Sequence, residues 1–199
     1  SYNLIYDVNQ GRRNIMSTKK NVAFIGLGTM GFPMAGHISK SNLFNLKVYN
    51  RTQEKGSSWS KNYEGEVVSS IKEAVIDADF ILTCTGRDED MMEIVFSDQG
   101  IISHLKKGSI FIDHTTTSYK LAQHLNDSLT AKGVAFIDAP VSGGEAGAVN
   151  GALSIMLGGP KKKLIQINNL MQSYAKNIVH IGPSGHGQLT KMVNQLCIG

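Results

Sequence analysis

The sequence predicts an α/β protein with a doubly wound, mostly parallel sheet, and three observations lead to this prediction. Short β-rich runs alternate along the chain with segments of helical spacing, as they do in successive β–α–β units. Several of the β-rich runs are apolar almost throughout, which is typical of parallel strands buried on both faces. A glycine-rich loop separates the first strand from the first helix, where doubly wound sheets bind nucleotides.

The predicted elements follow one another at short intervals. The strands are Val22–Ile25, Leu46–Tyr49, Phe80–Cys84, Ser109–Ile112, Val134–Ile137, Leu153–Leu157 and Ile178–Ile181. The helices are Gly31–Ser41, Ile71–Asp77, Asp88–Phe96, Ser118–Lys132 and Pro160–Ala175, and a further helix opens near Gln188. Residues 1–16 have no apolar period, so we expect a leader outside the fold. The sheet domain is expected over residues 17–182.

The bulk composition is that of an ordinary globular protein. The chain has 199 residues, of which 41% are hydrophobic and 18% charged, so it buries a core of normal size. A net charge of +4 is too small to indicate nucleic acid but suits an anionic ligand. The two cysteines favour a reducing compartment, and no stretch approaches the roughly 18 apolar residues of a membrane span. We therefore expect a cytoplasmic protein that binds neither nucleic acid nor membranes.

The glycine-rich loop has the pattern of a dinucleotide site. In such a site Gly26 permits the tight turn, Gly28 lets the backbone approach a pyrophosphate, and Gly31 lets helix and strand pack closely. The N-terminus of the following helix adds free N–H groups and a positive dipole end. The alternative is a tight turn without a ligand. The residues expected to contact the cofactor here are Gly26, Leu27, Gly28, Thr29, Met30 and Gly31.

The end of the second strand bears on the choice of cofactor. It reads Asn50-Arg51-Thr52, where an NAD enzyme usually carries an acidic residue for the ribose 2′-hydroxyl. Arginine instead binds a 2′-phosphate through two parallel hydrogen bonds, and Thr52 adds a hydroxyl donor. We therefore predict NADP in preference to NAD, the alternative being that Arg51 is an ordinary surface residue. A methyltransferase would also use an acidic residue at this point, so the triplet argues against that class.

Three later stretches complete the pattern: Phe111–Ser118, Asp138–Ala148 and Gly185–Gln195. With the glycine loop and Asn50-Arg51-Thr52, they resemble the β-hydroxyacid dehydrogenase family, which includes 3-hydroxyisobutyrate dehydrogenase, tartronate semialdehyde reductase and the glyoxylate/succinic semialdehyde reductases. The resemblance runs from about residue 21 to the end of the chain. It implies a Rossmann-type domain and an oxidoreductase that transfers a hydride between NADP(H), or NAD, and a small 3-hydroxy acid or semialdehyde bearing a carboxylate.

The resemblance also assigns roles to single residues. It implies that Ser142, Gly143 and Gly144 bind the substrate, and small residues at a strand-to-helix turn do expose N–H groups and a hydroxyl to a carboxylate. It makes Lys191 the catalytic acid/base, which exchanges the hydroxyl proton as the hydride is transferred. Asn194, one helical turn later, would hold the substrate or orient the lysine, whereas Gln195 departs from the family's second asparagine. It also implies that Thr116 contacts the nicotinamide side of the cofactor and that Thr85 and Gly86 line the cofactor loop, although Thr85-Gly86 stands where many members have a hydrophobic residue and proline.

The same resemblance implies more protein than these 199 residues. It makes residues 183–199 the start of a helix that links to an all-helical domain, and it implies a homo-oligomer at full length. Two alternatives stay open: a non-catalytic NADP-binding module or inactive fragment, and a relative of 6-phosphogluconate dehydrogenase, which would need a more basic pocket. His114, His180 and His186 lack the spacing of metal ligands, so no metal is expected.

Overall fold

The structure is a computed structural model that describes residues 3–6, 13–16 and 19–198. Its main sheet contains β3 (Lys20–Ile25), β4 (Phe44–Tyr49), β5 (Glu66–Val67), β6 (Phe80–Thr83), β7 (Ile110–Asp113), β8 (Ala135–Asp138), β9 (Val141–Ser142), β10 (Leu153–Gly158) and β11 (Ala175–Gly182). The helices are α1 (Gly31–Ser41), α2 (Gln53–Ser60), α3 (Ile71–Val75), α4 (Asp88–Phe96), α5 (Tyr119–Ala131), α6 (Gly144–Val149), α7 (Lys161–Gln172) and α8 (His186–Ile198), with a 3₁₀ turn at Ile101–Ser103.

Six parallel strands form the centre of the sheet, in the order β5-β4-β3-β6-β7-β8. The chain builds outwards from β3 in one direction and then outwards from β6 in the other, so the order reverses between these two strands. This is the strand order of a dinucleotide-binding doubly wound sheet. Beyond β8, β10 runs antiparallel and pairs with β9 and β11. The predicted fold class is therefore confirmed.

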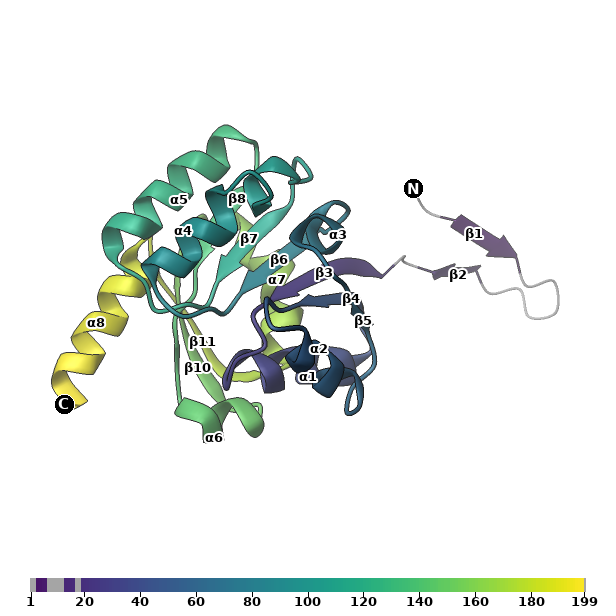
Figure 1. Cartoon of the computed structure of the whole chain (residues 1–199), viewed down its shortest axis with the longest axis horizontal. Helices are drawn as coiled ribbons and strands as arrows, with labels where there is room; N and C mark the ends of the chain where they lie inside the picture. The colour runs from purple at the N-terminus through teal and green to yellow at the C-terminus, as the bar shows by residue number, and fades with distance from the viewer. Residues whose placement is uncertain (1–2, 7–12, 17–18, 199) are drawn as a thin grey trace.

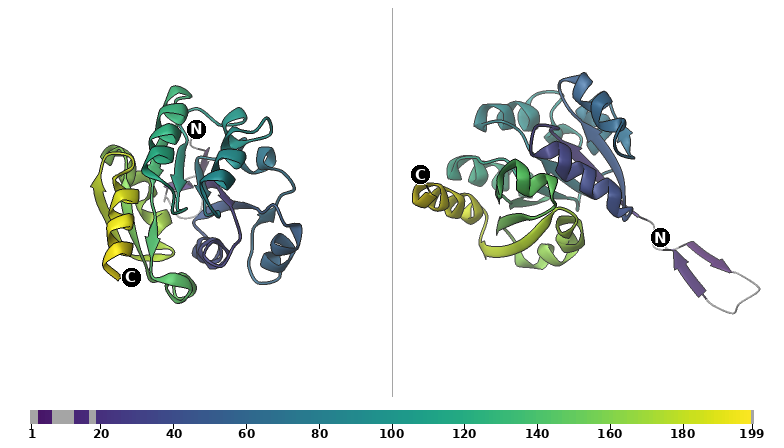
Figure 2. Two further views of the ribbon diagram at one scale, coloured as in Figure 1. Left: turned by 60° about the vertical axis from the view of Figure 1, so that its left-hand side comes forward. Right: turned by 90° about the horizontal axis from the view of Figure 1, so that it is seen from below.

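Alternating side chains along the strands divide the core into two layers. On β3, Val22 and Phe24 belong to one buried cluster, and Ala23 and Ile25 belong to the other. Helices α1, α2, α6 and α7 cover the first cluster, whereas α3, α4 and α5 cover the second. Figures 1 and 2 show these helices on opposite faces of the sheet. Burial on both faces explains why the central strands are apolar throughout.

Helix α2 was not expected from the sequence, and α6 was expected only as the helix that follows the turn at residues 142–144. Helix α2 contains a single large apolar residue, Trp59, which is fully buried and donates its indole N–H to the Phe32 carbonyl. Helix α6 is six residues long and rich in glycine and alanine. Neither segment has an apolar period, so tertiary contacts decide their conformation. Strand β11 also begins three residues earlier than predicted, at the buried Ala175, and the preceding helix α7 ends at Gln172 rather than at Ala175.

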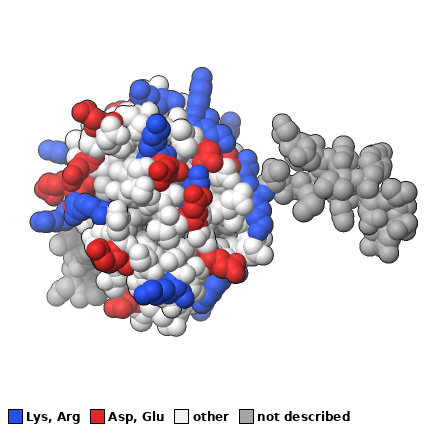
Figure 3. Space-filling view, turned by 45° about the vertical axis from the view of Figure 1, so that its right-hand side comes forward, with Lys and Arg blue, Asp and Glu red and all other residues white. Residues whose placement is uncertain are grey.

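The N-terminal region pairs with itself. Strand β1 (Asn3–Tyr6) lies antiparallel to β2 (Arg13–Met16) in a separate two-stranded sheet. The other residues of the expected leader, 1–2 and 7–12, lie outside the described residues, so its assignment stays a prediction. No helix in the described part of the chain is both long and apolar enough to cross a membrane. On the face shown in Figure 3, basic and acidic side chains are interspersed.

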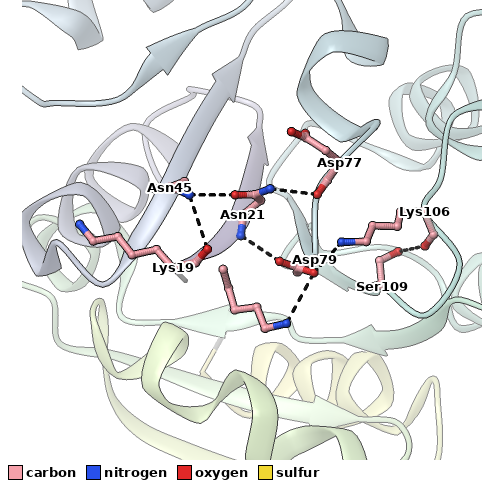
Figure 4. A network of polar contacts seen from close by, with 8 residues as sticks. Lys19, Asn21, Asn45, Asp77, Asp79, Lys106 and Ser109 are labelled. Atoms are coloured by element: carbon pink, nitrogen blue, oxygen red, sulfur yellow. Dashed lines mark hydrogen bonds and ion pairs between the residues drawn. The ribbon is translucent and has the colours of Figure 1, made fainter. Parts of the chain in front are cut away.

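A polar network joins the amino ends of the central strands (Figure 4). Asp79, just before β6, accepts hydrogen bonds from the Asn21 amide at 3.0 Å and from Lys106 Nζ at 2.9 Å, and Lys20 lies 3.7 Å away. Burial opposes the ionisation of Asp79, but Lys106, the Asn21 amide and Lys20 together keep its pKa below the ordinary value. The network fixes the end of the sheet opposite the glycine loop.

Helix α8 is attached to the sheet through its first turn. Asp138, at the end of β8, accepts hydrogen bonds from the backbone amides of Gly185 (2.6 Å) and Gln188 (3.0 Å). The side chain of Gln188 is fully buried and contacts the loop after β7: its Oε1 accepts from the Thr117 amide at 3.1 Å, and its Nε2 donates to the Thr115 carbonyl at 2.7 Å. These four bonds set the position of α8 relative to the strands.

A second buried carboxylate lies beside Asp138. Asp113 ends β7 directly opposite Asp138 and is fully buried. Its Oδ1 accepts from the Thr83 hydroxyl and the Thr115 amide, both at 2.9 Å, whereas Oδ2 has no partner among the described residues. Burial is the largest cause that raises the pKa of Asp113 to about 7, and the charge of Asp138 adds to it.

Replacing Gln188 tests the attachment of α8. Methionine is similar in size but would leave the Thr117 amide and the Thr115 carbonyl buried without partners, at a cost of about 1–3 kcal/mol for each group. We expect Gln188→Met to lower the free energy of unfolding in urea by about 2–6 kcal/mol. The control is Gln166→Met, at an exposed position of α7. A loss no larger than that of the control would contradict the assignment.

Asp113 makes stability depend on pH with a definite sign. Its pKa is about 7 in the fold and 3.8 ordinarily, so the stabilisation from its protonated form is complete below pH 3.8 and is lost as the pH rises through about 7. Asp113→Asn cannot ionise. We therefore expect its free energy of unfolding, relative to wild type, to rise between pH 4 and pH 8 in urea titrations. The exposed control Asp98→Asn should show no such trend; an Asp113→Asn difference independent of pH would refute the shift.

Candidate functional site

A cavity of about 420 Å³ opens at the carboxyl ends of β3, β4 and β6. This is the crevice where the strand order reverses, which is the usual ligand site of doubly wound sheets. Its volume lies within the range of small-molecule pockets. Seven of the residues that the sequence predicts to bind the cofactor line it: Gly26, Gly28, Asn50, Arg51, Thr52, Thr85 and Gly86.

The glycine turn brings three elements together at the floor of the cavity. Gly26 has φ +102°, a conformation that L side chains rarely adopt, and its amide donates to the Tyr49 carbonyl at 2.9 Å. A Cβ on Gly26 would collide with the carbonyl oxygen of Cys84, after β6, and a Cβ on Gly31 would collide with the carbonyl oxygen of Gly26. Only glycine therefore allows β3, β6 and α1 to approach this closely.

The rest of the loop is open to ligand. A Cβ on Gly28 would meet nothing within 4 Å, so the backbone there faces free space. In the first turn of α1, the Phe32 amide already donates to the Gly28 carbonyl at 2.9 Å and Pro33 has no N–H, so these two residues offer no free amide to a ligand. Thr29 is exposed, and Met30 is the residue before the first helical turn. Leu27, Gly28 and Thr29 also border a neighbouring hollow of about 490 Å³.

Asn50 braces the loop from the end of β4. Its Oδ1 accepts from the Leu27 amide at 2.8 Å, and its Nδ2 donates to the Thr52 carbonyl at 3.0 Å. An aspartate could accept the first of these bonds but could not donate the second. The side-chain amide of Asn50 therefore stabilises the loop in a way that aspartate could not, and Asn50 also lines the cavity.

Cations and anions face each other at the mouth of the cavity. Arg51 is 76% exposed, and Lys55, one turn further along on α2, lines the cavity beside it. On the other side, α4 contributes Asp90 and Glu93. The Arg51 Nη1 atom lies 3.8 Å from Asp90 Oδ1 and 3.6 Å from Glu93 Oε2. Arg51 thus spans the opening by ion pairs to the opposite wall.

The loop after β6 forms the inner wall. The Thr85 amide donates to the Thr115 hydroxyl at 3.0 Å, and the two hydroxyls lie 3.3 Å apart. A Cβ on Gly86 would collide with the Asp90 carboxylate. Burial raises the pKa of the neighbouring Cys84 thiol to about 12, with a contribution from Asp113, so this cysteine stays protonated and unreactive.

The predicted substrate-binding loop, residues 142–144, forms the expected strand-to-helix turn, but it does not line the cavity. Ser142 ends β9 and Gly144 begins α6, so the three residues form a strand-to-helix turn as predicted. Gly143 and Gly144 have φ values of +130° and +58°, and a Cβ on Gly144 would meet nothing within 4 Å. Helix α6 lies against α1, because His37 Nε2 is 3.1 Å from the Ala148 carbonyl.

The remaining predicted residues do not line the cavity. Lys191 and Asn194 are half-buried on α8, and Thr116 is exposed in the loop after β7 between the bonded residues Thr115 and Thr117. The structure therefore brings the glycine loop, the Asn50–Thr52 segment and the Thr85–Gly86 segment together. It does not place Lys191, Asn194, Thr116 or the Ser142–Gly144 loop among the residues that line this cavity.

Several residues of the site escaped sequence reasoning. Lys55 could have been found from its charge and its closeness to Arg51 in the sequence. Asp90 belongs to the acidic first turn of α4, which the helix dipole alone would explain, although it also lines the cavity. Asp138 and Gln188 left no local signal, because their contacts join residues far apart in the chain.

The site residues fit a dinucleotide, and the described residues include no group of three or more His, Cys, Asp or Glu able to hold a metal. The open backbone at Gly28, the positive end of the α1 dipole and the cations at the mouth suit a pyrophosphate with an adenosine end. His114 is fully occupied: Nδ1 donates to the Ala139 carbonyl at 2.7 Å, and Nε2 accepts from the Tyr174 hydroxyl at 2.9 Å. Burial lowers its pKa to about 4.

Comparison with known proteins gives relatives of one kind. An uncharacterized oxidoreductase of Shewanella frigidimarina is 44% identical over 177 residues, which cover 89% of this chain and 60% of the relative. An NAD-dependent L-serine dehydrogenase of Pseudomonas aeruginosa is 32% identical, over 88% of this chain and 58% of the relative. The solved structure of Mycobacterium tuberculosis 3-hydroxyisobutyrate dehydrogenase with L-serine superposes with a TM-score of 0.85 at 28% identity, over 91% and 60% of the two chains.

The chain thus spans about 60% of the length of these relatives. The names of the relatives agree with the resemblance that the motifs carry. The model of the NAD-binding domain of 6-phosphogluconate dehydrogenase matches residues 21–182, which include the glycine turn and every strand of the main sheet. The chain therefore belongs to the oxidoreductase family defined by this NAD-binding domain.

Proposed function

We propose that this chain is the NADP(H)-binding part of an oxidoreductase that acts on a small 3-hydroxy acid or the corresponding semialdehyde. The observation that carries the proposal is the pair of cations, Arg51 and Lys55, at the mouth of a cavity floored by the glycine turn. Thr52 lines the same wall. Two cations and a hydroxyl are the groups that recognise a phosphate on the ribose 2′-position.

NAD is the competing cofactor. The Pseudomonas aeruginosa relative is named as NAD-dependent, and Asp90 and Glu93 reduce the positive charge around the 2′-position. Against this, residues 50–52, directly after β4, include no acidic side chain that could accept hydrogen bonds from both ribose hydroxyls. The direct neighbours of the 2′-position on the β4 side are thus cationic or neutral, which favours NADP.

The substrate class rests on the relatives and on the Ser142–Gly144 turn. The Mycobacterium tuberculosis structure is a 3-hydroxyisobutyrate dehydrogenase with L-serine. Both 3-hydroxyisobutyrate and L-serine carry a hydroxyl on the carbon β to a carboxylate. In this chain Gly144, where a Cβ would meet nothing within 4 Å, and Gly143 beside it offer backbone N–H groups, and Ser142 offers a hydroxyl, to such a carboxylate. A substrate with one carboxylate and one hydroxyl or aldehyde group fits these donors.

Lys191 supplies the proton chemistry in this proposal. A bound nicotinamide would donate or accept the hydride. In the reduction of an aldehyde, the Lys191 ammonium donates a proton to the carbonyl oxygen; in the oxidation of an alcohol, the neutral amine takes the hydroxyl proton. Asn194 lies one turn further on the same face of α8, where its amide orients the lysine or the substrate.

A second reading is a cofactor-binding module without catalysis. It is favoured by one observation: Lys191 does not line the cavity that the glycine turn forms. The relatives of this chain are longer, so the two readings are separated by turnover of the complete protein. The full-length enzyme is expected to be a homo-oligomer, and size-exclusion chromatography with light scattering measures this directly.

Arg51 is the first residue to test. Replacing it with aspartate turns an attraction for the 2′-phosphate into a repulsion, so we expect Arg51→Asp to weaken NADPH binding by about 10- to 100-fold and NADH binding far less. Calorimetric titration of the wild type and the variant with both nucleotides measures this. Lys61→Asp, at an exposed position after α2, controls for the change in net charge. Equal losses for both nucleotides would rule out a contact to the 2′-phosphate.

Lys191 is tested in the complete protein. Because general acid–base catalysis contributes about 10²- to 10⁴-fold, Lys191→Ala should reduce turnover of a semialdehyde panel by that factor. The NADPH dissociation constant should stay within a few-fold, since Lys191 lies outside the cavity that binds the adenosine and pyrophosphate. Lys176→Ala, exposed on β11, is the matched control. Retained turnover in Lys191→Ala would show that another group transfers the proton.

A further inference from the structure

Two acidic residues of α4 form the ion pairs across the cavity mouth, and they differ in how many other contacts hold their side chains. Asp90 is held in place: its Oδ2 accepts from the Arg87 amide at 3.1 Å, while Oδ1 faces Arg51 at 3.8 Å. Glu93 lies one turn later, its side chain is 67% exposed, and its only ion pair among the described residues is the one to Arg51 at 3.6 Å. Glu93 therefore contacts the cavity through Arg51, whereas Asp90 also caps its helix.

The charges around the mouth sum to zero. Arg51 and Lys55 contribute two positive charges, and Asp90 and Glu93 contribute two negative ones. A phosphate with nearly two negative charges that approaches Arg51 must therefore displace the two carboxylates from it. It also enters the field of both carboxylates, which repel it. A ribose with two neutral hydroxyls meets no such repulsion, and its hydroxyls can donate hydrogen bonds to a carboxylate.

We propose that Glu93 is a specificity-determining residue that opposes the 2′-phosphate and narrows the preference for NADP(H) over NAD(H). It acts in two ways: it competes for the Arg51 guanidinium, and it repels the phosphate directly. This inference rests on the proposed function, because it concerns the same nucleotide site. It assigns the selection of the cofactor to both walls of the cavity, with α4 opposing the cations of the Arg51–Lys55 segment.

The expected effect is moderate because the groups are exposed. Exposed ion pairs contribute little in water, and the repulsion between charges at several ångströms is of similar size. Removing the charge of Glu93 should therefore raise the ratio of NADPH affinity to NADH affinity by about threefold to tenfold. Salt screens exposed charges, so the increase should shrink as the ionic strength rises.

The experiment compares Glu93→Gln with a matched variant on the same helix. Glu89→Gln removes the same charge at an exposed position that does not line the cavity. Dissociation constants for NADPH and NADH are measured by calorimetry for the wild type and both variants at low and moderate salt. We expect the affinity ratio to rise in Glu93→Gln and to stay at the wild-type value in Glu89→Gln.

A double-mutant cycle separates the two actions of Glu93. If competition for the guanidinium contributes, then Glu93→Gln should change the ratio less in an Arg51→Gln background than in the wild type. An equal rise in both backgrounds would remove the competition and leave only direct repulsion. Because the Glu93 side chain is exposed, we expect its replacement to leave the fold intact. The urea midpoint of every variant checks this.

The outcomes distinguish this inference from the function on which it rests. If the wild type binds NADPH and NADH but Glu93→Gln leaves their ratio unchanged, the role of Glu93 is overturned and the cofactor site stands. If Glu89→Gln raises the ratio as much as Glu93→Gln, the effect is one of net charge, and the role of Glu93 is likewise overturned. If the wild type binds neither nucleotide, the proposed function fails, and this inference fails with it.

Discussion

The close approach of β3, β6 and α1 at the glycine turn is the constraint on which the site depends. Side chains at Gly26 and Gly31 would collide with the backbone of Cys84 and Gly26 respectively, so these three elements meet only because two side chains are missing. The meeting point lies where the strand order reverses, and the crevice opens there because the following segments turn to opposite sides. The helix N-terminus and the open backbone of Gly28 thereby reach the place where phosphates bind.

Charged side chains line the mouth of the crevice, whereas the close packing of the glycine turn forms its floor. Asn50 joins the glycine loop to the Arg51 segment through two side-chain hydrogen bonds, so the position of the cations is tied to that of the turn. Helix α4 presents its carboxylates from the other side. In the proposed site, the backbone of the glycine turn would contact the pyrophosphate of a nucleotide, and the exposed side chains at the mouth would contact its adenosine end.

Local patterns predicted what depends on local structure. The buried central strands, α1, α4 and the glycine turn follow from apolar runs, helical spacing and the conformational freedom of glycine, all of which are visible in a few consecutive residues. Helix α2 was missed because one buried residue, Trp59, holds it in place. The bonds of Asp138 and Gln188 join residues 47 to 73 positions apart, and no periodicity reports such contacts. The role of Lys191 came from resemblance, since a helical lysine alone carries no signal.

The attachment of α8 has a mechanical consequence. The helix is fixed to the sheet at Gly185 and Gln188, while Met192, Val193 and Leu196 further along are exposed. Among the described residues, the hydrogen bonds to Asp138 attach α8 to the sheet at its first turn, and the apolar side chains of its later turns are exposed. With a rise of about 1.5 Å per residue, Lys191 lies about 5 Å beyond Gln188 and the last turn about 15 Å beyond it. A small rotation at Asp138 displaces residues near 198 about three times as far as Lys191, because Lys191 lies close to the point where the helix is attached to the sheet.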